Sequence, residues 1–289
     1  MRKLLVLIGA SLVLLCADHA QAWWFEGHAH ITENSVQHLP QPLKKFVNDN
    51  LTSIRSYSAN EPPGRHYIDI DVYPEFHSHT MPRDLNVLYT KYGTSYVDGN
   101  GISPWTIQNY RQSLTGQMQA ATTPAQWLAL TKNFGEMAHY IEDIFNPLHT
   151  TQNFDGQLTG NSGIHGRYEG SMIERHFADL NVPTFNAQYV PDTVDAILNS
   201  IDVTWNYVDD IMAADTLARG SPRQYLEPYY TSMWSSTGTF TQDQFKLASR
   251  MVANTWYSAW MDAGSPTPIP EPALISLLLV PLAFLSRRR

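Results

Sequence analysis

The sequence predicts an all-α protein built as a single multi-helix domain. Apolar residues recur every three to four positions in several long segments. Helix-start signals stand before these segments, and only one short stretch alternates as a strand would. Of the 289 residues, 43% are hydrophobic, which is enough for a sizeable core.

Residues 1–22 have the three-part pattern of a secretory signal peptide. Two basic residues form a positive start, an apolar run covers residues 4–15, and Ala20-Gln21-Ala22 is a small-x-small cleavage site. We therefore expect an exported protein of the Gram-negative type, located in the periplasm, on the cell surface or outside the cell. Its mature chain is expected to begin at Trp23.

The only cysteine, Cys16, lies inside this segment, so the mature chain is expected to have neither disulfides nor cysteine ligands. The formal charge is −8, and removal of Arg2, Lys3 and Asp18 takes away one net positive charge, which leaves −9. An acidic chain binds polyanions poorly, which argues against nucleic-acid packaging. A nuclease stays open, because bound metal ions supply local positive charge.

The main domain is expected to cover residues 23–263 and to contain four recognisable helices. Their expected starts are Ser103-Pro104, Thr123-Pro124, Pro191-Asp192 and a capping box of Thr241 and Gln244. The third helix is expected to continue through Met212, because its apolar period does.

Three stretches of the domain lack the helical period. Residues Tyr67 to Val72 alternate apolar and acidic side chains, which predicts a short strand. Long loops are expected at 73–102 and 150–190, and loops of such length are often functional.

Residues 264–289 are expected to form a linker followed by a C-terminal sorting or anchor segment. The linker, 264–272, is rich in Pro, Ser and Thr, and the apolar run 273–286 is short for a membrane span. Pro270-Glu271-Pro272, the apolar run and the closing arginines resemble PEP-CTERM sorting signals of Gram-negative bacteria. A membrane or a sorting machinery is therefore an expected partner, and the alternative is a short basic-flanked anchor.

Five potential metal ligands lie within 31 residues: His139, Asp143, His149, His165 and Glu169. The two four-residue spacings place a histidine and a carboxylate on one helical face. A single buried His–Asp pair is as readily explained as a core hydrogen bond. Imidazole and carboxylate are nevertheless what zinc takes where thiolate is absent, so the whole set predicts a metal site.

The mature N-terminus is a further candidate ligand. Cleavage after Ala22 leaves Trp23 first, five residues before His28. A terminal amine and its own carbonyl can chelate a metal in a five-membered ring. Such a ligand would exist only after export.

Together these residues resemble the zinc-dependent phospholipase C and single-strand-specific nuclease superfamily. The resemblance covers residues 23–169 and includes a histidine in an aromatic-Ile-Asp context, His66-Tyr67-Ile68-Asp69. It implies two to three zinc ions. The implied ligand groups are Trp23 with His28; His66 with His139, joined to the first by a bridging Asp143; and His149 with His165 and Glu169.

One superfamily ligand has no match, since the expected aspartate upstream of His66 is missing from the run Asn50-Leu51-Thr52-Ser53. Glu61 and Asp49 are the two candidate substitutes. The residues expected to be catalytic are Asp143, His139 and Glu61. Of the two candidates for the missing aspartate, Glu61 lies nearer to His66 in the sequence.

The resemblance implies hydrolysis of phosphate esters by a hydroxide that bridges two zinc ions. Glu169, the cysteine-free mature chain and the short gap from His149 to His165 favour phospholipase C-type activity on phospholipid. The N-terminal spacing and the Gly27-His28-Ala29 context favour the alternative, a nuclease acting on single-stranded nucleic acid. Two non-enzymatic alternatives are a zinc-stabilised surface protein and a helical binding protein whose histidines only pack.

Overall fold

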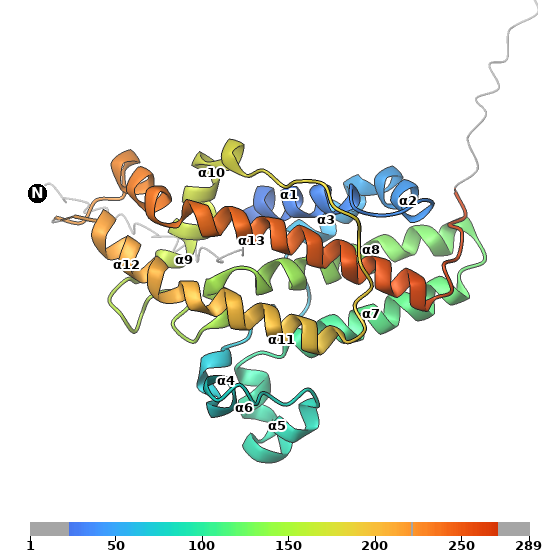
Figure 1. Ribbon diagram of the computed structural model, residues 1–289, viewed down its shortest axis with the longest axis horizontal. Coiled ribbons are helices and arrows are strands. Elements are labelled where there is room, and N and C mark those ends of the chain that lie inside the picture. The colour runs from blue at the N-terminus through green and yellow to red at the C-terminus, as the bar shows by residue number, and fades with distance from the viewer. Residues whose placement is uncertain (1–22, 221, 271–289) are drawn as a thin grey trace, which may run out of the picture.

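The computed structural model describes residues 23–220 and 222–270, which form helices joined by loops. Neither range contains a strand, so the prediction of an all-α protein is confirmed. Figure 1 shows an elongated bundle whose long helices run along the horizontal axis, with a group of short helices projecting below it.

Long helices form the body of the bundle. They are α7 (Ser103–Ala120), α8 (Pro124–Ile144), α11 (Thr193–Thr204), α12 (Val208–Ala218) and α13 (Glu227–Asp262). Helix α13 packs against α7, α8 and α12. Between α8 and α13, the rings of Phe134 and Trp256 pack edge to face with centroids 5.4 Å apart. Burial of such apolar faces is what stabilises the bundle.

Three N-terminal helices that the sequence analysis did not anticipate pack beside α8. They are α1 (Trp24–Val36), α2 (Leu43–Asp49) and α3 (Leu51–Ala59). The close approach of α3 to α8 depends on Gly135, because a Cβ there would lie 2.5 Å from the Ile54 carbonyl oxygen. This approach brings the Ser58 carbonyl within hydrogen-bonding distance of α8.

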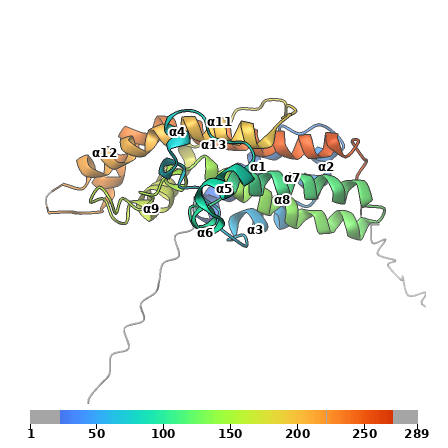
Figure 2. The same ribbon diagram turned by 90° about the horizontal axis from the view of Figure 1, so that it is seen from below.

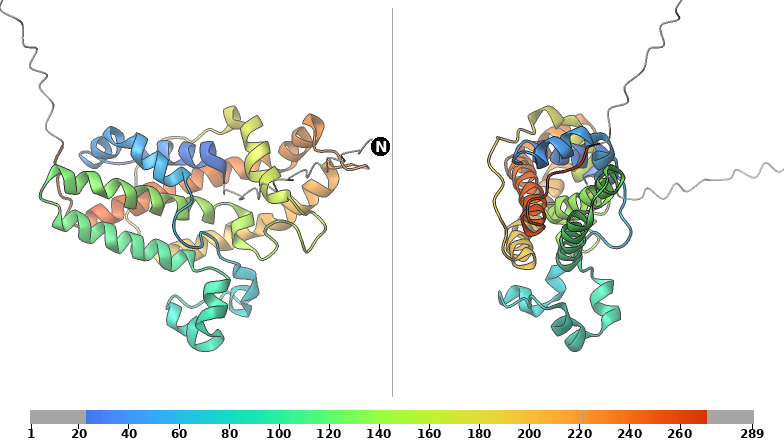
Figure 3. Two further views of the ribbon diagram at one scale, coloured as in Figure 1. Left: turned by 180° about the vertical axis from the view of Figure 1, so that it is seen from behind. Right: turned by 90° about the vertical axis from the view of Figure 1, so that its right-hand side faces the viewer.

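A group of short helices replaces the loop expected at 73–102, so that prediction was wrong. The helices are α4 (Pro74–His77), α5 (Leu85–Tyr92) and α6 (Thr94–Gly99). The end-on view in Figure 3 shows the group standing off the bundle, and Figure 2 shows α5 and α6 from below. Helices this short lack several turns of apolar period, which is why periodicity did not reveal them.

The strand predicted over Tyr67 to Val72 is wrong as well. Residues Ile70–Val72 form a 3-10 turn. The Ile68 N–H donates to the His149 carbonyl at 3.0 Å, and the Asp69 N–H donates to the Asn100 carbonyl at 2.7 Å. Two successive N–H groups thus bond to two different segments instead of to one neighbouring strand. The alternating sequence pattern reflects the burial of Ile68 and Ile70.

The region 150–190 is only partly the loop that was expected. It contains α9 (Ile164–Gly166), a π-helix (Arg167–Met172), α10 (Ile173–Arg175) and a 3-10 turn (Phe177–Asp179). Arg167 holds this stretch to α12 by donating to the buried Asp215 carboxylate at 3.0 Å. Tertiary contacts of this kind are invisible to a periodicity argument.

Three of the predicted helix starts are confirmed, and the first is that of α7, which begins at Ser103 with Pro104 in its first turn. Thr123 and Gln126 form a capping box at the start of α8. The Asp192 side chain accepts the Asp195 N–H at the start of α11. The helix expected to run through Met212 is instead divided into α11 and α12 by a 3-10 turn at Trp205–Tyr207.

The cap predicted at Ser103 and the capping box predicted at Thr241 have different roles in the structure. Ser103 is already helical, and its hydroxyl donates to the Tyr67 carbonyl at 2.8 Å, which ties the start of α7 to the His66 segment. Thr241 lies in the middle of α13, where its hydroxyl donates to the Thr237 carbonyl. The predicted capping box at Thr241 was therefore wrong, because the helix begins at Glu227.

The expected signal segment lies outside the described residues, as does the C-terminal segment from residue 271. The linker residues 264–270 are described, and Ile269 packs against the core. Trp260 Nε1 also donates to the Pro266 carbonyl at 2.8 Å. Among the described helices, none combines the length and the apolar character needed to cross a membrane.

Candidate metal centre

Histidine and acidic side chains from distant parts of the chain meet at one end of α8. They form three groups whose potential ligand atoms lie within 4.8 Å of one another. The groups are His28 with His139 and Asp143; His66 with Asp143 and His149; and His149 with His165 and Glu169. Because Asp143 and His149 each belong to two groups, the three form one continuous cluster.

The last turns of α8 and the turn after it supply the centre of the cluster. His139 and Asp143 are one turn apart on α8 and are both buried. After the helix ends, the Asn146 side chain accepts the Leu148 N–H at 3.1 Å and caps the 3-10 turn Pro147–Thr150. This turn places His149 beside the helix end, so that it contacts Asp143 and the third group.

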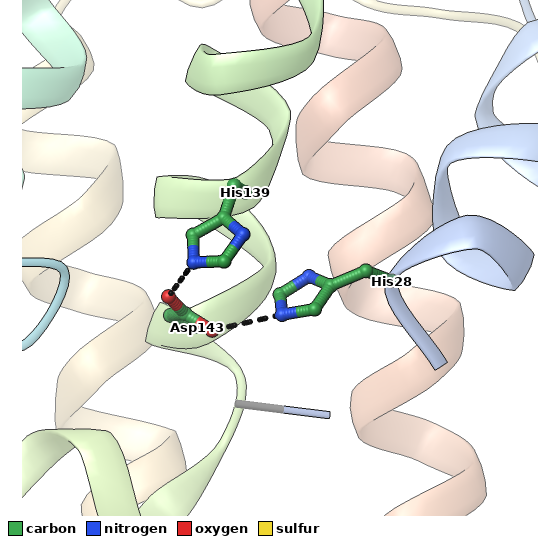
Figure 4. A group of neighbouring side chains, drawn as sticks. All are labelled: His28, His139 and Asp143. Atoms are coloured by element: carbon green, nitrogen blue, oxygen red, sulfur yellow. Dashed lines mark ion pairs between the residues drawn. The ribbon is translucent and has the colours of Figure 1, made fainter. Parts of the chain in front are cut away.

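The first group contains two parallel imidazole rings. The rings of His28 and His139 stack with centroids 4.2 Å apart and planes inclined by 12°. Figure 4 shows both rings directed at the Asp143 carboxylate. His139 Nε2 lies 3.1 Å from Asp143 Oδ2, and His28 Nε2 lies 3.5 Å from Asp143 Oδ1.

Each of these two rings has a hydrogen-bond partner on the side that faces away from Asp143. His139 Nδ1 lies 2.6 Å from the Ser58 carbonyl, which can only accept. His28 Nδ1 lies 2.6 Å from Glu142 Oε2. In a neutral His139 ring, Nε2 therefore presents a lone pair to Asp143, and neither His28 Nε2 nor Asp143 Oδ1 has a hydrogen-bond partner. A cation between these atoms would satisfy all of them.

The second group adds His66 from the segment between α3 and the 3-10 turn. His66 Nδ1 lies 2.9 Å from Asp143 Oδ2 and 3.0 Å from His139 Nε2. Burial lowers the pKa of His66, but the Asp143 carboxylate outweighs it and raises that pKa to about 9. The site thus stabilises positive charge strongly, as a metal-binding position must.

Asp143 is the negative centre of the cluster. Burial alone would raise its pKa, but His139, His149 and His66 together hold the pKa of this carboxyl well below its usual range. The carboxylate is therefore ionised and fully buried. Its two oxygens face different groups, since Oδ1 is near His28 while Oδ2 is near His66 and His139.

The third group is built by the loop and π-helix that follow Thr150. Glu169 Oε2 lies 2.9 Å from His165 Nε2 and 3.4 Å from His149 Nε2, and the two Nε2 atoms are 3.1 Å apart. His165 Nδ1 lies 3.1 Å from the Phe154 carbonyl, so in the neutral ring its Nε2 also presents a lone pair. Glu169 is buried, yet His165 and His149 lower its pKa below the ordinary value. Its Oε1 has no hydrogen-bond partner.

Three other predicted residues lie at or beyond the edge of the cluster. Glu61 Oε2 is 3.5 Å from His66 Nε2, the nitrogen that faces away from Asp143, and Glu61 belongs to none of the three groups. Asp49 pairs with Lys45 at 2.6 Å on the exposed surface of α2. The Trp23 side chain is buried, and its Nε1 donates to the backbone carbonyl of Glu142 at 3.0 Å. The role of the Trp23 amine stays a prediction.

The sequence analysis missed two buried polar residues that support the cluster. Glu142 lies between His28 and Thr32, whose hydroxyl donates to Glu142 Oε1 at 2.7 Å. Burial raises the pKa of the Glu142 carboxyl well above its ordinary value. Asn146 donates to Glu169 Oε2 at 2.8 Å. The available signal was their position, because both are polar residues beside the His139–Asp143 pair in an otherwise apolar stretch.

Comparison with known proteins gives a match in structure alone. No protein-family model matches the sequence, and no curated protein matches it either. Among solved structures, the alpha toxin from Clostridium absonum is similar with a TM-score of 0.51 at 11% sequence identity. The match covers 85% of this chain and only 65% of the length of the toxin chain. The fold of this chain is therefore the helical fold found in that alpha toxin.

Proposed function

We propose that the mature chain is an exported zinc-dependent phosphodiesterase with phospholipase C-like activity. One observation carries the proposal: imidazole nitrogens and carboxylate oxygens from three groups converge on shared positions. The shared Asp143 presents one oxygen to His28 and the other to His66 and His139. Asp143 would therefore be a ligand shared by two of the groups.

The donor chemistry fits zinc. The three groups offer only imidazole nitrogen and carboxylate oxygen, and each has the three protein ligands typical of catalytic zinc sites. Bound zinc would supply a Lewis acid and a water acidic enough to ionise near neutral pH. Two to three ions would be held, with the third group, His149, His165 and Glu169, forming a set separate from Asp143.

The open edge of the cluster is where a phosphodiester would enter. The side chain of His66 is 13% exposed and that of Glu61 is 39% exposed, whereas Asp143 is fully buried. We assign to the Glu61 carboxylate the role of holding a proton at this edge, next to His66. The buried residues instead fix the positions of the charges that a phosphate would meet.

Phospholipid is the favoured substrate and single-stranded nucleic acid the alternative. Glu169 in the third group, the acidic mature chain and the absence of thiols from residues 23–289 support the phospholipid assignment. The five-residue spacing from Trp23 to His28 supports the nuclease assignment. The two activities share the same site and chemistry, so they must be separated by substrate.

The test is zinc analysis of the exported protein together with two assays run side by side, on phosphatidylcholine and on single-stranded DNA. We expect two to three zinc ions per chain and phosphatidylcholine hydrolysis that a chelator abolishes and zinc restores. Hydrolysis of DNA instead would assign the nuclease alternative. Bound zinc without either activity would assign a zinc-stabilised surface protein, and less than one zinc per chain would overturn the proposal.

A further inference from the structure

Glu142 is adjacent to Asp143 on α8, yet its carboxylate contacts the opposite nitrogen of the His28 ring. Glu142 Oε2 lies 2.6 Å from His28 Nδ1, while Asp143 Oδ1 lies 3.5 Å from His28 Nε2. We propose that Glu142 is a positioning residue that fixes the proton of His28 on Nδ1 and so makes Nε2 the ligand atom of the first group. This inference rests on the zinc-dependent function proposed above.

The surroundings of Glu142 determine the direction of these hydrogen bonds. Both Glu142 and His28 are essentially inaccessible to solvent, so water does not compete for either side chain. The Thr32 hydroxyl donates to Glu142 Oε1 at 2.7 Å, which leaves Oε2 as the acceptor that faces His28. On the other side of the ring, His28 Nε2 makes no hydrogen bond although Asp143 Oδ1 lies 3.5 Å away, so the geometry places the ring proton on Nδ1, where Glu142 Oε2 accepts it.

The same network also orients the second ring of the first group. The Thr32 and Ser58 hydroxyl oxygens are 2.9 Å apart, and the Ser58 carbonyl accepts from His139 Nδ1 at 2.6 Å. A chain of contacts from Glu142 through Thr32 to Ser58 thus holds two stacked imidazoles with both Nε2 atoms toward Asp143. Partners of this kind fix the tautomer of a metal-binding histidine and make it more basic.

Glu142 and Asp143 lie on opposite sides of the His28 ring. Loss of the Glu142 acceptor should weaken the first group without affecting the third, because Glu169 has its own partners in His149, His165 and Asn146.

The experiment compares Glu142→Met and Glu142→Gln in the full mature protein. Methionine keeps the length but removes the acceptor, and the Thr32 hydroxyl can then donate to Ser58. We expect Glu142→Met to weaken one zinc by about 10–100-fold in competition with a chelator, with the remaining zinc unchanged. Glutamine keeps an oxygen that can accept from His28 Nδ1, so its effect on zinc affinity should be smaller.

A second measurement shows which nitrogen of the His28 ring carries the proton. In metal-free protein labelled with ¹⁵N-histidine, NMR should show His28 protonated on Nδ1 in the wild type and in Glu142→Gln, and no longer predominantly so in Glu142→Met. The matched control is Glu136→Met on the same helix, whose carboxylate accepts from the Tyr110 hydroxyl at 3.1 Å and not from a cluster histidine. It should leave both zinc affinity and the His28 signal unchanged.

Unchanged zinc affinity and an unchanged His28 tautomer in Glu142→Met would overturn the inference. If Glu142→Met does not fold, the shorter acid in Glu142→Asp serves instead, and wild-type zinc affinity there together with a changed tautomer would also contradict it. A wild-type protein that binds no zinc would defeat the proposed function. The tautomer of its His28 would still show whether Glu142 fixes the proton.

Discussion

His139 Nε2 and Asp143 Oδ2 lie 3.1 Å apart, one turn from each other on α8, with no proton between them in the neutral ring. His139 has already donated its only N–H, from Nδ1, to the Ser58 carbonyl. A satisfied core His–Asp pair would instead share a proton between ring and carboxylate. This geometry is the one expected of the metal-binding pair in the proposed function.

Replacement of Asp143 by asparagine should remove the centre of the cluster. The amide carries no charge, so repulsion between neighbouring dications rises and at least one zinc is lost. Turnover should fall by orders of magnitude, since activation of water depends on the metals. A purely structural role predicts a loss of only about 1–3 kcal/mol in stability. Zinc content, melting temperature and rate measured together decide between them, and wild-type zinc with wild-type turnover would refute the cluster.

Glu61 and Asp49 should respond differently to the same change. Glu61→Gln should lower turnover by about a hundredfold or more, with most of the zinc retained, because Glu61 contacts His66 at the open edge. Asp49→Asn should change neither turnover nor zinc content, because Asp49 pairs with Lys45 on the surface. Rates and zinc content of the two single variants provide the comparison. Equal effects of the two variants would show that Glu61 does not have the role assigned to it at the open edge of the cluster.

The free amine of Trp23 is expected to bind one zinc. The Trp23 side chain is buried against Phe245 and Tyr168, so residue 23 is anchored next to the first group. One extra residue before Trp23 should abolish the terminal chelate, weaken a single zinc and lower activity. Mass spectrometry confirms the terminus, and titration with a chelator measures the affinity. Full activity of the extended protein would show that the amine is not used.

The segment after the main domain should be dispensable for catalysis, but not all of it for stability. A chain ending at Pro270 keeps the contact of Ile269 with the core and the hydrogen bond from Trp260 to Pro266. It should match the full mature chain in zinc content and rate. A chain ending at Gly264 should bind zinc equally but lose about 1–3 kcal/mol of stability. Loss of activity with intact zinc would place the tail in the site.

His38 should make stability fall in acid independently of the cluster. Burial lowers the pKa of His38 to about 4, below the ordinary 6.5. Between these values the unfolded chain takes up a proton that the folded chain does not, so this contribution is complete above pH 6.5 and is lost as the pH falls toward 4. Melting temperatures of the metal-free protein from pH 4 to 7 should show a shallower decline for His38→Gln than for the wild type. The exposed His77→Gln is the control, and identical slopes for all three proteins would contradict the prediction.

Local spacing in the sequence accounts for the pairs that share a helical face. His139 with Asp143, and His165 with Glu169, are each four residues apart, and that spacing places both side chains on one side of a helix wherever the helix packs. The capping box at Thr123 is likewise a local interaction and was predictable. The all-α class followed for the same reason, because apolar periodicity depends on neighbours in the chain.

Only the tertiary structure decided which of these pairs meet and what holds them. His28 reaches Asp143 because α1 packs beside α8, and α3 supplies the Ser58 carbonyl because Gly135 admits it so closely. The choice of Glu61 over Asp49 beside His66, and the burial of Glu142 against His28, depend on contacts between segments far apart in sequence. Such contacts arise from the packing of whole apolar faces, and no local pattern of residues encodes that packing.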